Sequence, residues 1–247
     1  MGWRLRKQIF IAFIFLLILS IPLYFLYLKF KPGPSCYNNR QDYNEEGVDC
    51  GGPCPPCEVY KLQDLIVKKP QIVIYPDQSM DVVVPVTNPN EEYGLKSFNY
   101  EIYFYGNNPN EVAKIEGNSF IFPLEEKYII ETAISSPKFL IKNATITINY
   151  KKENWVKTEE RKPNIELLSY KYNENYLEAS ILNKDYKNYD KLNLYFLLYD
   201  EFNTLMGVVK TEVYDFKSNE VKNIKIYSLP PLLGEPNLVI LYSEKEF

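Results

Sequence analysis

A run of about 20 uncharged and mostly apolar residues, from residue 9 to residue 28, constrains this chain most strongly. An α-helix of that length rises about 30 Å, which matches the hydrocarbon core of a bilayer. Three basic residues lie within residues 1–8 and two follow the run, so the positive-inside rule favours a cytoplasmic N-terminus. The sequence therefore predicts a cytoplasmic tail at residues 1–8, a single-pass transmembrane helix at residues 9–28, and extracytoplasmic domains beyond the cell membrane.

A cleaved signal peptide is the alternative interpretation of this run. Signal peptides usually carry about 7 to 15 apolar residues, followed by small residues at a cleavage site. The run here is longer and ends in Leu-Tyr-Phe-Leu-Tyr-Leu, which offers no such site. We therefore expect the helix to be retained as an anchor, with the lipid bilayer as its partner through residues 9–28.

All four cysteines lie in residues 29–58, directly after the predicted helix. A short extracytoplasmic segment cannot build a core of its own, so closely spaced cysteines there usually form disulfides. We expect a Cys-rich stalk with two bridges confined to residues 36–57, and the sequence leaves three pairings open. The cysteines are Cys36, Cys50, Cys54 and Cys57.

Metal binding is the alternative for this segment. Zinc sites usually pair two short cysteine knuckles, whereas Cys36 stands alone. Oxygen side chains between the cysteines could hold calcium, although we prefer a solvated polar loop, and we expect no cofactor and no metal. The stretch Glu45-x-Gly-Val-Asp-Cys-Gly-Gly-Pro-Cys-x-Pro-Cys57 resembles a short motif found beside membrane anchors and in secreted multidomain proteins of bacteria and archaea. This resemblance implies a structural stalk without activity.

From residue 59 onward, apolar and polar residues alternate as they do in half-buried β-strands. Turn residues interrupt the strands at short intervals, which favours antiparallel sandwiches over βαβ units. The charged, proline-containing stretch at residues 158–163 predicts a linker between two domains. The expected fold is mainly β, with immunoglobulin-like or fibronectin-III-like sandwiches of about seven strands each at residues 59–157 and 164–247.

Eight alternating apolar residues are expected to form the two sandwich cores: Phe98, Tyr100, Ile102, Phe104, Leu192, Leu194, Phe196 and Leu198. The two blocks share a rhythm of strands and turns, but we identify no residue-level repeat that would prove duplication.

Each block carries a family resemblance. Val84-Pro-Val-Thr-Asn-Pro-Asn90, followed by Gly94 and a strand to Gly106, resembles the WHy sandwich of late-embryogenesis-abundant proteins over about residues 60–150. Phe196-Leu-Leu-Tyr-Asp200, followed by Gly207, is similar to the FxLYD type of extracytoplasmic sandwich over about residues 164–247, although Lys217-Ser-Asn-Glu220 lacks the glycine expected before its glutamate. Both resemblances imply envelope proteins of bacteria or archaea, and neither family contributes catalytic residues.

The sequence also argues against catalysis and nucleic-acid binding. It contains no histidine, which removes the commonest general base, the serine and cysteine triads, and most catalytic zinc sites. The first 31 residues hold five of the 28 basic residues and none of the 32 acidic ones, so the remainder carries a net charge of −9. That charge repels nucleic acid. The protein is therefore not expected to be an enzyme.

The preferred function is a membrane-anchored, non-catalytic binding or spacer protein of the cell envelope, whose partner is another envelope protein or a glycan. A stress-protective protein of the late-embryogenesis-abundant kind is the first alternative. A carboxylate-dependent hydrolase is the second, with Glu91-Glu92, Glu125-Glu126 and Glu159-Glu160 as available pairs. A partner surface is expected on loops, and the candidate residues are Asn88, Pro89, Asn90 and Tyr93.

Overall fold

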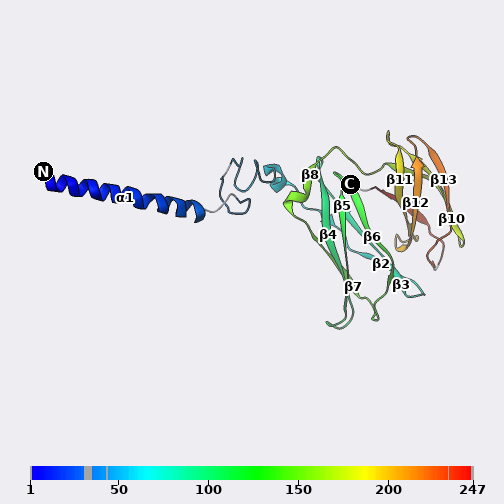
Figure 1. Ribbon diagram of the computed structural model, residues 1–247. Helices are drawn as coiled ribbons and strands as arrows, with labels where there is room; N and C mark the ends of the chain where they lie inside the picture. The colour runs from blue at the N-terminus through cyan, green and yellow to red at the C-terminus, as the bar shows by residue number, and fades with distance from the viewer. Residues whose placement is uncertain (1, 31–34, 43, 233, 246–247) are drawn as a thin grey trace. The chain divides into compact units, whose positions relative to one another are not determined.

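The computed structural model in Figure 1 divides into two compact units, Met1–Glu58 and Val59–Phe247. It describes residues 2–30, 35–42, 44–232 and 234–245. Parts of the predicted tail, stalk and second sandwich lie outside the described residues, namely residues 1, 31–34, 43, 233 and 246–247.

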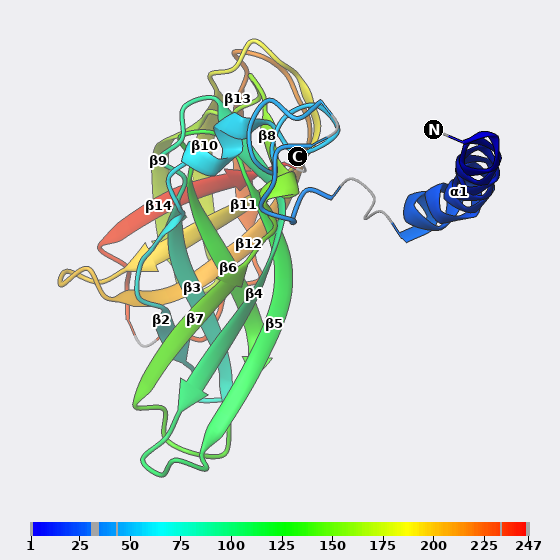
Figure 2. The ribbon, with the colours of Figure 1, turned by 90° about the vertical axis from the view of Figure 1, so that its left-hand side faces the viewer.

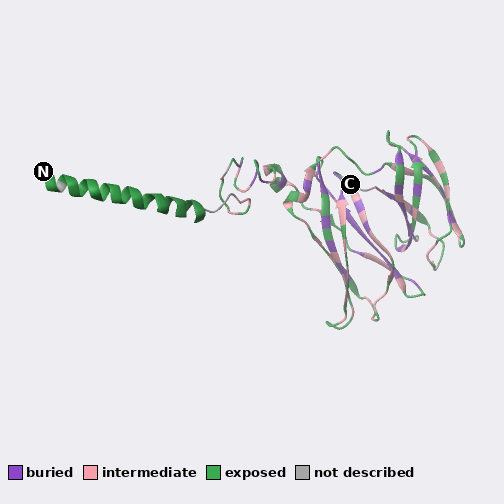
Figure 3. Ribbon diagram, viewed as in Figure 1, coloured by how far each residue is buried: buried purple, intermediate pink, exposed green. Residues whose placement is uncertain are grey.

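The first unit begins with α1 (Trp3–Phe30), a helix of 28 residues. All of its described side chains are exposed, as the uniform colour of the helix in Figure 3 shows. A helix that is apolar on every side needs apolar surroundings that the protein itself does not supply here. The stretch Arg6–Phe30 is long and apolar enough to cross a membrane, as either a membrane anchor or a signal sequence would be.

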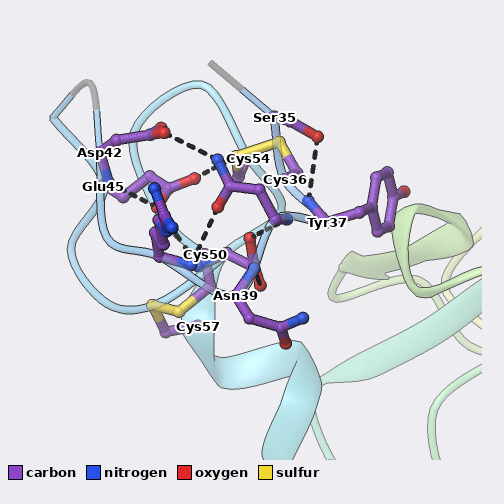
Figure 4. Close-up of a disulfide and its surroundings, with 12 residues drawn as sticks. Ser35, Cys36, Tyr37, Asn39, Asp42, Glu45, Cys50, Cys54 and Cys57 are labelled. Carbon is purple, nitrogen blue, oxygen red and sulfur yellow. Dashed lines mark hydrogen bonds between the residues drawn. A yellow bond between two sulfur atoms is a disulfide. The ribbon is translucent and has the colours of Figure 1, made fainter. Parts of the chain in front are cut away.

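The Cys-rich segment is organised around two disulfides (Figure 4). Cys36 pairs with Cys54 and Cys50 pairs with Cys57, with Cα atoms 5.5 and 4.8 Å apart. These distances are normal for a disulfide. Both bridges stay within residues 36–57, and the structure selects one of the three pairings that the sequence left open.

The adjacent glycines of this motif are required by the turn between the disulfides. Gly51 and Gly52 have φ angles of 78° and 59°, in the left-handed region that favours glycine. A Cβ atom on Gly52 would lie 2.3 Å from the carbonyl oxygen of Asn44, and one on Gly51 would lie 2.6 Å from the Cβ of Glu46. Larger residues would therefore clash with the loop that the disulfides hold in place.

The first sandwich of the second unit consists of two antiparallel sheets. In one sheet β3 lies between β6 on one side and β1 and β2 on the other. In the other sheet β4 lies between β5 on one side and β7 and β8 on the other. The strands are β1 (Ile66–Val67), β2 (Gln71–Ile74), β3 (Ser79–Thr87), β4 (Tyr93–Tyr105), β5 (Val112–Ile121), β6 (Glu126–Ser135), β7 (Asn143–Asn149) and β8 (Trp155–Lys157); the 3-10 helices are η1 (Cys57–Lys61) and η2 (Lys152–Asn154).

The second sandwich repeats this plan with two antiparallel sheets, β9–β10–β13 and β14–β11–β12. Its strands are β9 (Ile165–Asn173), β10 (Tyr176–Asn183), β11 (Tyr189–Tyr199), β12 (Leu205–Phe216), β13 (Val221–Ile226) and β14 (Leu238–Glu244).

The two sandwiches have the same strand order, because β2, β3, β4, β5, β6 and β7 correspond in sequence and pairing to β9 through β14. Against the expected number of about seven, the described residues form eight strands in the first sandwich and six in the second. In the first, β1 and β2 share one side of β3 and are separated by Pro70, which has no N–H to continue a ladder. Each sandwich thus follows one six-strand plan.

Each sandwich encloses its own apolar core. The first core joins side chains of β3 and β6 to side chains of β4, β5, β7 and β8. The second joins β10 and β13 to β11, β12 and β14. The eight predicted core residues all lie in these cores, which confirms them: Phe98, Tyr100, Ile102, Phe104, Leu192, Leu194, Phe196 and Leu198.

A third apolar cluster, here called the junction, joins the two sandwiches. Val83 of β3 packs there with Leu197 and Tyr199 of β11 and with Tyr242 of β14, while Ile130 of β6 packs against the same cluster. Sheet β2–β3–β6 therefore packs on sheet β14–β11–β12, and the four sheets form a stack (Figure 1). The strands of these two inner sheets cross at a steep angle in Figure 2. Strands β3 and β11 are buried on both faces.

Candidate binding site at the junction of the two sandwiches

A buried asparagine holds the turn after β3. The amide nitrogen of Asn88 donates to the carbonyl oxygens of Tyr93, at 2.7 Å, and Phe122, at 2.9 Å. Its Oδ1 accepts from the backbone N–H of Asn90, at 3.0 Å. Asn88, Asn90 and Tyr93 are buried, and Pro89 is half-buried. The predicted partner patch at these four residues assumed an exposed turn, and that assumption is wrong for three of them. The side chains of Asn88 and Asn90 bond the backbone, and the side chain of Tyr93 lies in the first core.

Asn183 occupies the equivalent position after β10. Its amide nitrogen donates to the carbonyl oxygens of Lys187, at 2.9 Å, and Lys217, at 3.0 Å, and its Oδ1 accepts from the backbone N–H of Asp185, at 3.0 Å. This is a residue-level repeat that the sequence interpretation missed. Its signal is an Asn-x-Asn or Asn-x-Asp turn directly after a buried strand, followed by the tyrosine that begins the next strand, Tyr93 or Tyr189.

A second turn is repeated as well. The two buried asparagines, Asn88 and Asn183, are here called the clamp asparagines. The backbone N–H of each donates to the carbonyl oxygen of a glutamate, Glu125 for Asn88 and Glu220 for Asn183. In the second sandwich Asn219, just before that glutamate, has a φ angle of 57°. Asparagine tolerates this left-handed conformation better than other side chains do. It therefore fills the position where the FxLYD resemblance leads one to expect glycine.

A polar cavity of about 450 Å³ lies where the two sandwiches meet. Strands β4, β5 and β6 contribute one side, and β11 and β14 of the second sandwich contribute the other. Its volume is within the range of small-molecule sites in proteins. The lining residues are Lys96, Ser97, Tyr100, Asn118, Ser119, Phe120, Tyr128, Ile129, Ile130, Asn193, Tyr195 and Glu244.

Tyr100 forms one wall of this cavity. Its ring crosses the β4–β5 ladder above Gly117, where a Cβ atom would lie only 2.4 Å from the Tyr100 hydroxyl. The hydroxyl then donates to Oε1 of Glu131 on β6, at 2.5 Å. Burial, followed by this hydrogen bond to a carboxylate, raises the pKa of Tyr100 well above its usual range. Gly117 is thus the residue that lets a tyrosine close the gap between the two sheet edges.

The opposite wall is held by a buried lysine. The side chain of Lys127 is 1% exposed, and its ammonium forms an ion pair with Glu244 of the second sandwich. The same ammonium lies 3.9 Å from the centre of the Phe120 ring, as in a cation–π contact. The hydroxyl of Tyr195 lies 3.5 Å from the other carboxylate oxygen of Glu244. Burial and the negative charge of Glu244 raise the pKa of Tyr195.

Beside this pair, Tyr242 connects the junction to Glu125. Its hydroxyl donates to Oε1 of Glu125, at 3.1 Å, and Oε2 accepts from the backbone N–H of Phe122, at 2.8 Å. Burial raises the pKa of the Glu125 carboxyl, and the charge of Lys127 opposes that shift. A buried carboxyl that receives two hydrogen bonds in this way fixes the position of β6 against β14.

A second polar contact joins the sandwiches at another point of the junction. Asp81 of β3 is buried and accepts from the Tyr75 hydroxyl, at 2.5 Å, and from the backbone N–H of Val208 on β12, at 3.2 Å. Burial and this carboxylate raise the pKa of Tyr75. A Cβ atom on Gly207 would lie 2.7 Å from the Tyr75 hydroxyl. Gly207 therefore permits the close approach of the two sheets.

Four of the six glutamates considered for hydrolytic chemistry form side-chain interactions within the protein. Glu92 and Glu126 form surface ion pairs with Lys157 and Lys68. Glu125 lies inside the protein and is bonded as described above. Glu160 forms an ion pair with Lys245.

One group in the Cys-rich segment has the composition of a metal site. A carboxylate oxygen of Glu45 and the sulfur atoms of Cys36 and Cys54 lie within 4.8 Å of one another. Both sulfur atoms belong to the same disulfide. A metal needs the thiolate form of cysteine, so this pair offers none while it is oxidised.

No protein-family model matches this chain, and no curated protein matches its sequence. The chemistry of the junction cavity therefore has to be read from its own residues. Four aromatic rings, two amides, two serine hydroxyls, the ammonium of Lys96 and the paired carboxylate of Glu244 can together hold a small polar ligand by stacking and hydrogen bonding.

Proposed function

We propose that this chain is a membrane-anchored, non-catalytic binding or spacer protein of the cell envelope. In this proposal residues 1–8 lie in the cytoplasm, residues 9–28 of α1 span the membrane, and the disulfide segment and both sandwiches lie outside. The partner is another envelope protein or a glycan.

The junction between the sandwiches is the observation that carries the proposal. A flexible linker alone would leave two independent domains, whereas an apolar cluster, the Lys127–Glu244 pair and the Asp81–Val208 contact join them. An inter-domain contact with such a hydrophobic centre favours one rigid body. A rigid body behind a disulfide-stapled segment suits the presentation of a surface at a fixed place in the envelope.

Three further features support this role. The disulfides suit an oxidising compartment. The sequence has no histidine, which disfavours most hydrolytic mechanisms. The WHy-like and FxLYD-like resemblances of the two sandwiches agree with an extracytoplasmic role.

Protease accessibility tests the orientation. With a tag at each end of the full chain, protease added to intact cells or spheroplasts should remove the C-terminal tag and leave the N-terminal tag intact. A cytoplasmic marker protein must survive as the control. Protection of the C-terminal tag would contradict the proposed topology.

Co-sedimentation tests the binding role. The full chain in phospholipid nanodiscs should sediment with purified envelope fragments more than empty nanodiscs do. If it instead hydrolyses an envelope glycan, and one Glu→Gln change abolishes that activity without unfolding the protein, the non-catalytic proposal is wrong.

A further inference from the structure

We propose that the junction cavity binds a short, neutral saccharide or the end of a neutral glycan chain. This inference rests on the proposed binding function and assigns its ligand class and its site. It follows from the free hydrogen-bonding groups, the charge balance and the aromatic walls of the cavity.

Two amides of the cavity have no role in holding the fold. Asn118 lies on β5 and Asn193 lies on β11, so each sandwich contributes one. Within the described part of the chain neither side chain makes a hydrogen bond, in contrast to Asn88 and Asn183, whose amides are fully engaged. An amide presents both a donor and an acceptor, which suits a ligand with vicinal hydroxyl groups.

Lys96 and Glu244 line the cavity, while Lys127 and Glu131 are bonded to its lining residues Glu244 and Tyr100. These two ammonium groups and two carboxylates balance one another. The ammonium of Lys127 is fully buried and already paired with Glu244, so it offers no free positive charge to an anion. The carboxylates of Glu244 and Glu131 would repel an anionic ligand, while each already accepts a hydrogen bond from within the protein. A neutral ligand therefore meets the lowest desolvation cost here.

The walls of the cavity are aromatic. Tyr100, Phe120, Tyr128 and Tyr195 surround the amides and serine hydroxyls. Aromatic rings bury the apolar C–H faces of a sugar, while tyrosine hydroxyls and amides bond its edges. Because the cavity is bounded by both sandwiches, it suits a chain end or a short saccharide better than the middle of a long polymer.

Binding can be measured with neutral saccharides of one to four units, built from glucose, mannose, galactose or N-acetylglucosamine. The full chain is placed in phospholipid nanodiscs, because detergents with sugar headgroups would compete for the site. Isothermal titration calorimetry should give a millimolar or tighter dissociation constant for one of these series. The same saccharide should raise the unfolding temperature, since it binds only the folded state.

Site variants then locate the binding. N118A and N193A should each weaken the saccharide about five- to tenfold, as expected for the loss of one hydrogen bond, with an unchanged unfolding midpoint in the absence of sugar. S119W should fill the cavity and abolish binding. N223A is the matched control, because Asn223 lies on β13 away from the cavity and should leave the affinity unchanged.

Three results would overturn the inference: no binding by any series at millimolar concentration, unchanged binding by the N118A/N193A double variant, or preferential binding of an organic cation such as choline. If saccharide binding fails while co-sedimentation with envelope fragments persists, the ligand assignment is wrong and the proposed function stands. If saccharide binds but the sandwiches prove to be cytoplasmic, the proposed function is wrong instead.

Discussion

Replacement of the two clamp asparagines by alanine should destabilise the protein strongly and by different amounts. The side chain of Asn88 uses all four of its hydrogen-bonding positions, on the carbonyls of Tyr93 and Phe122 and on the backbone and side-chain nitrogens of Asn90. At about 1 kcal/mol for each hydrogen bond, N88A should cost about 4 kcal/mol. Because folded domains are stable by only about 5–15 kcal/mol, this is a large fraction of the total.

Replacement of Asn183 by alanine should reduce the free energy of unfolding somewhat less. Its amide nitrogen lies within hydrogen-bonding distance of three carbonyl oxygens but has only two hydrogens, and its Oδ1 accepts one bond. Three bonds at a time correspond to about 3 kcal/mol for N183A. N88D should cost at least as much as N88A, because it keeps the size of the side chain but loses both donors and buries a charge.

Urea unfolding of the full chain, followed by far-UV circular dichroism, measures these differences. N99A is the matched control, because Asn99 is exposed on β4 and bonds no other described side chain, so its change should stay within about 0.5 kcal/mol. The reasoning is wrong if N88A lowers the free energy of unfolding by less than about 1 kcal/mol while the slope of that free energy against urea concentration is unchanged. It is also wrong if N99A lowers the free energy of unfolding by as much as N88A.

Two further predictions concern the disulfides and the buried carboxyl. Peptide mapping of the unreduced protein should recover Cys36–Cys54 and Cys50–Cys57, and recovery of a Cys36–Cys57 peptide would contradict the structure; from sequence separations of 18 and 7, loss of each bridge should destabilise its segment by about 3 and about 2 kcal/mol. Because burial raises the pKa of Glu125 above its ordinary value of 4.5, its contribution to stability is present below that pH and is lost as the pH rises through the folded-state pKa. Urea unfolding from pH 4 upward should therefore show wild type losing stability relative to E125Q, and the opposite slope would refute the assignment.

The cores could be predicted from the sequence because alternation reports directly which side of a strand is buried. Leu192, Leu194, Phe196 and Leu198 repeat every second residue, and all four are buried. The junction was missed although a signal exists. Tyr195 and Leu197 lie between them and Tyr199 follows, so β11 has a nearly continuous apolar run, which is typical of a strand covered on both faces.

The candidate site could not be predicted in the same way. Its two free amides, Asn118 and Asn193, lie on different sandwiches, and only the packing of sheet on sheet brings them to one cavity. At the turn containing Asn88 the sequence interpretation instead proposed a surface where the side chains are buried. Polar turn residues were interpreted as an exposed surface, whereas their hydrogen bonds depend on Phe122 and Glu125, in the turn between β5 and β6, which comes later in the chain.

The shared strand order has a consequence for how many sandwiches can stack. Sheet β2–β3–β6 of the first sandwich packs on sheet β14–β11–β12 of the second. These two sheets are not equivalent in the shared strand order, so the contact is head to tail and no symmetry axis closes it. A head-to-tail contact of this kind leaves one outer face on each sandwich that, among the described residues, has no neighbouring sandwich. When Tyr93 of β4 is aligned with Tyr189 of β11, Glu101 stands where the second sandwich has the buried Leu197, and Glu101 pairs with Lys114. The charges on that face of the first sandwich make burial against a further sandwich unfavourable.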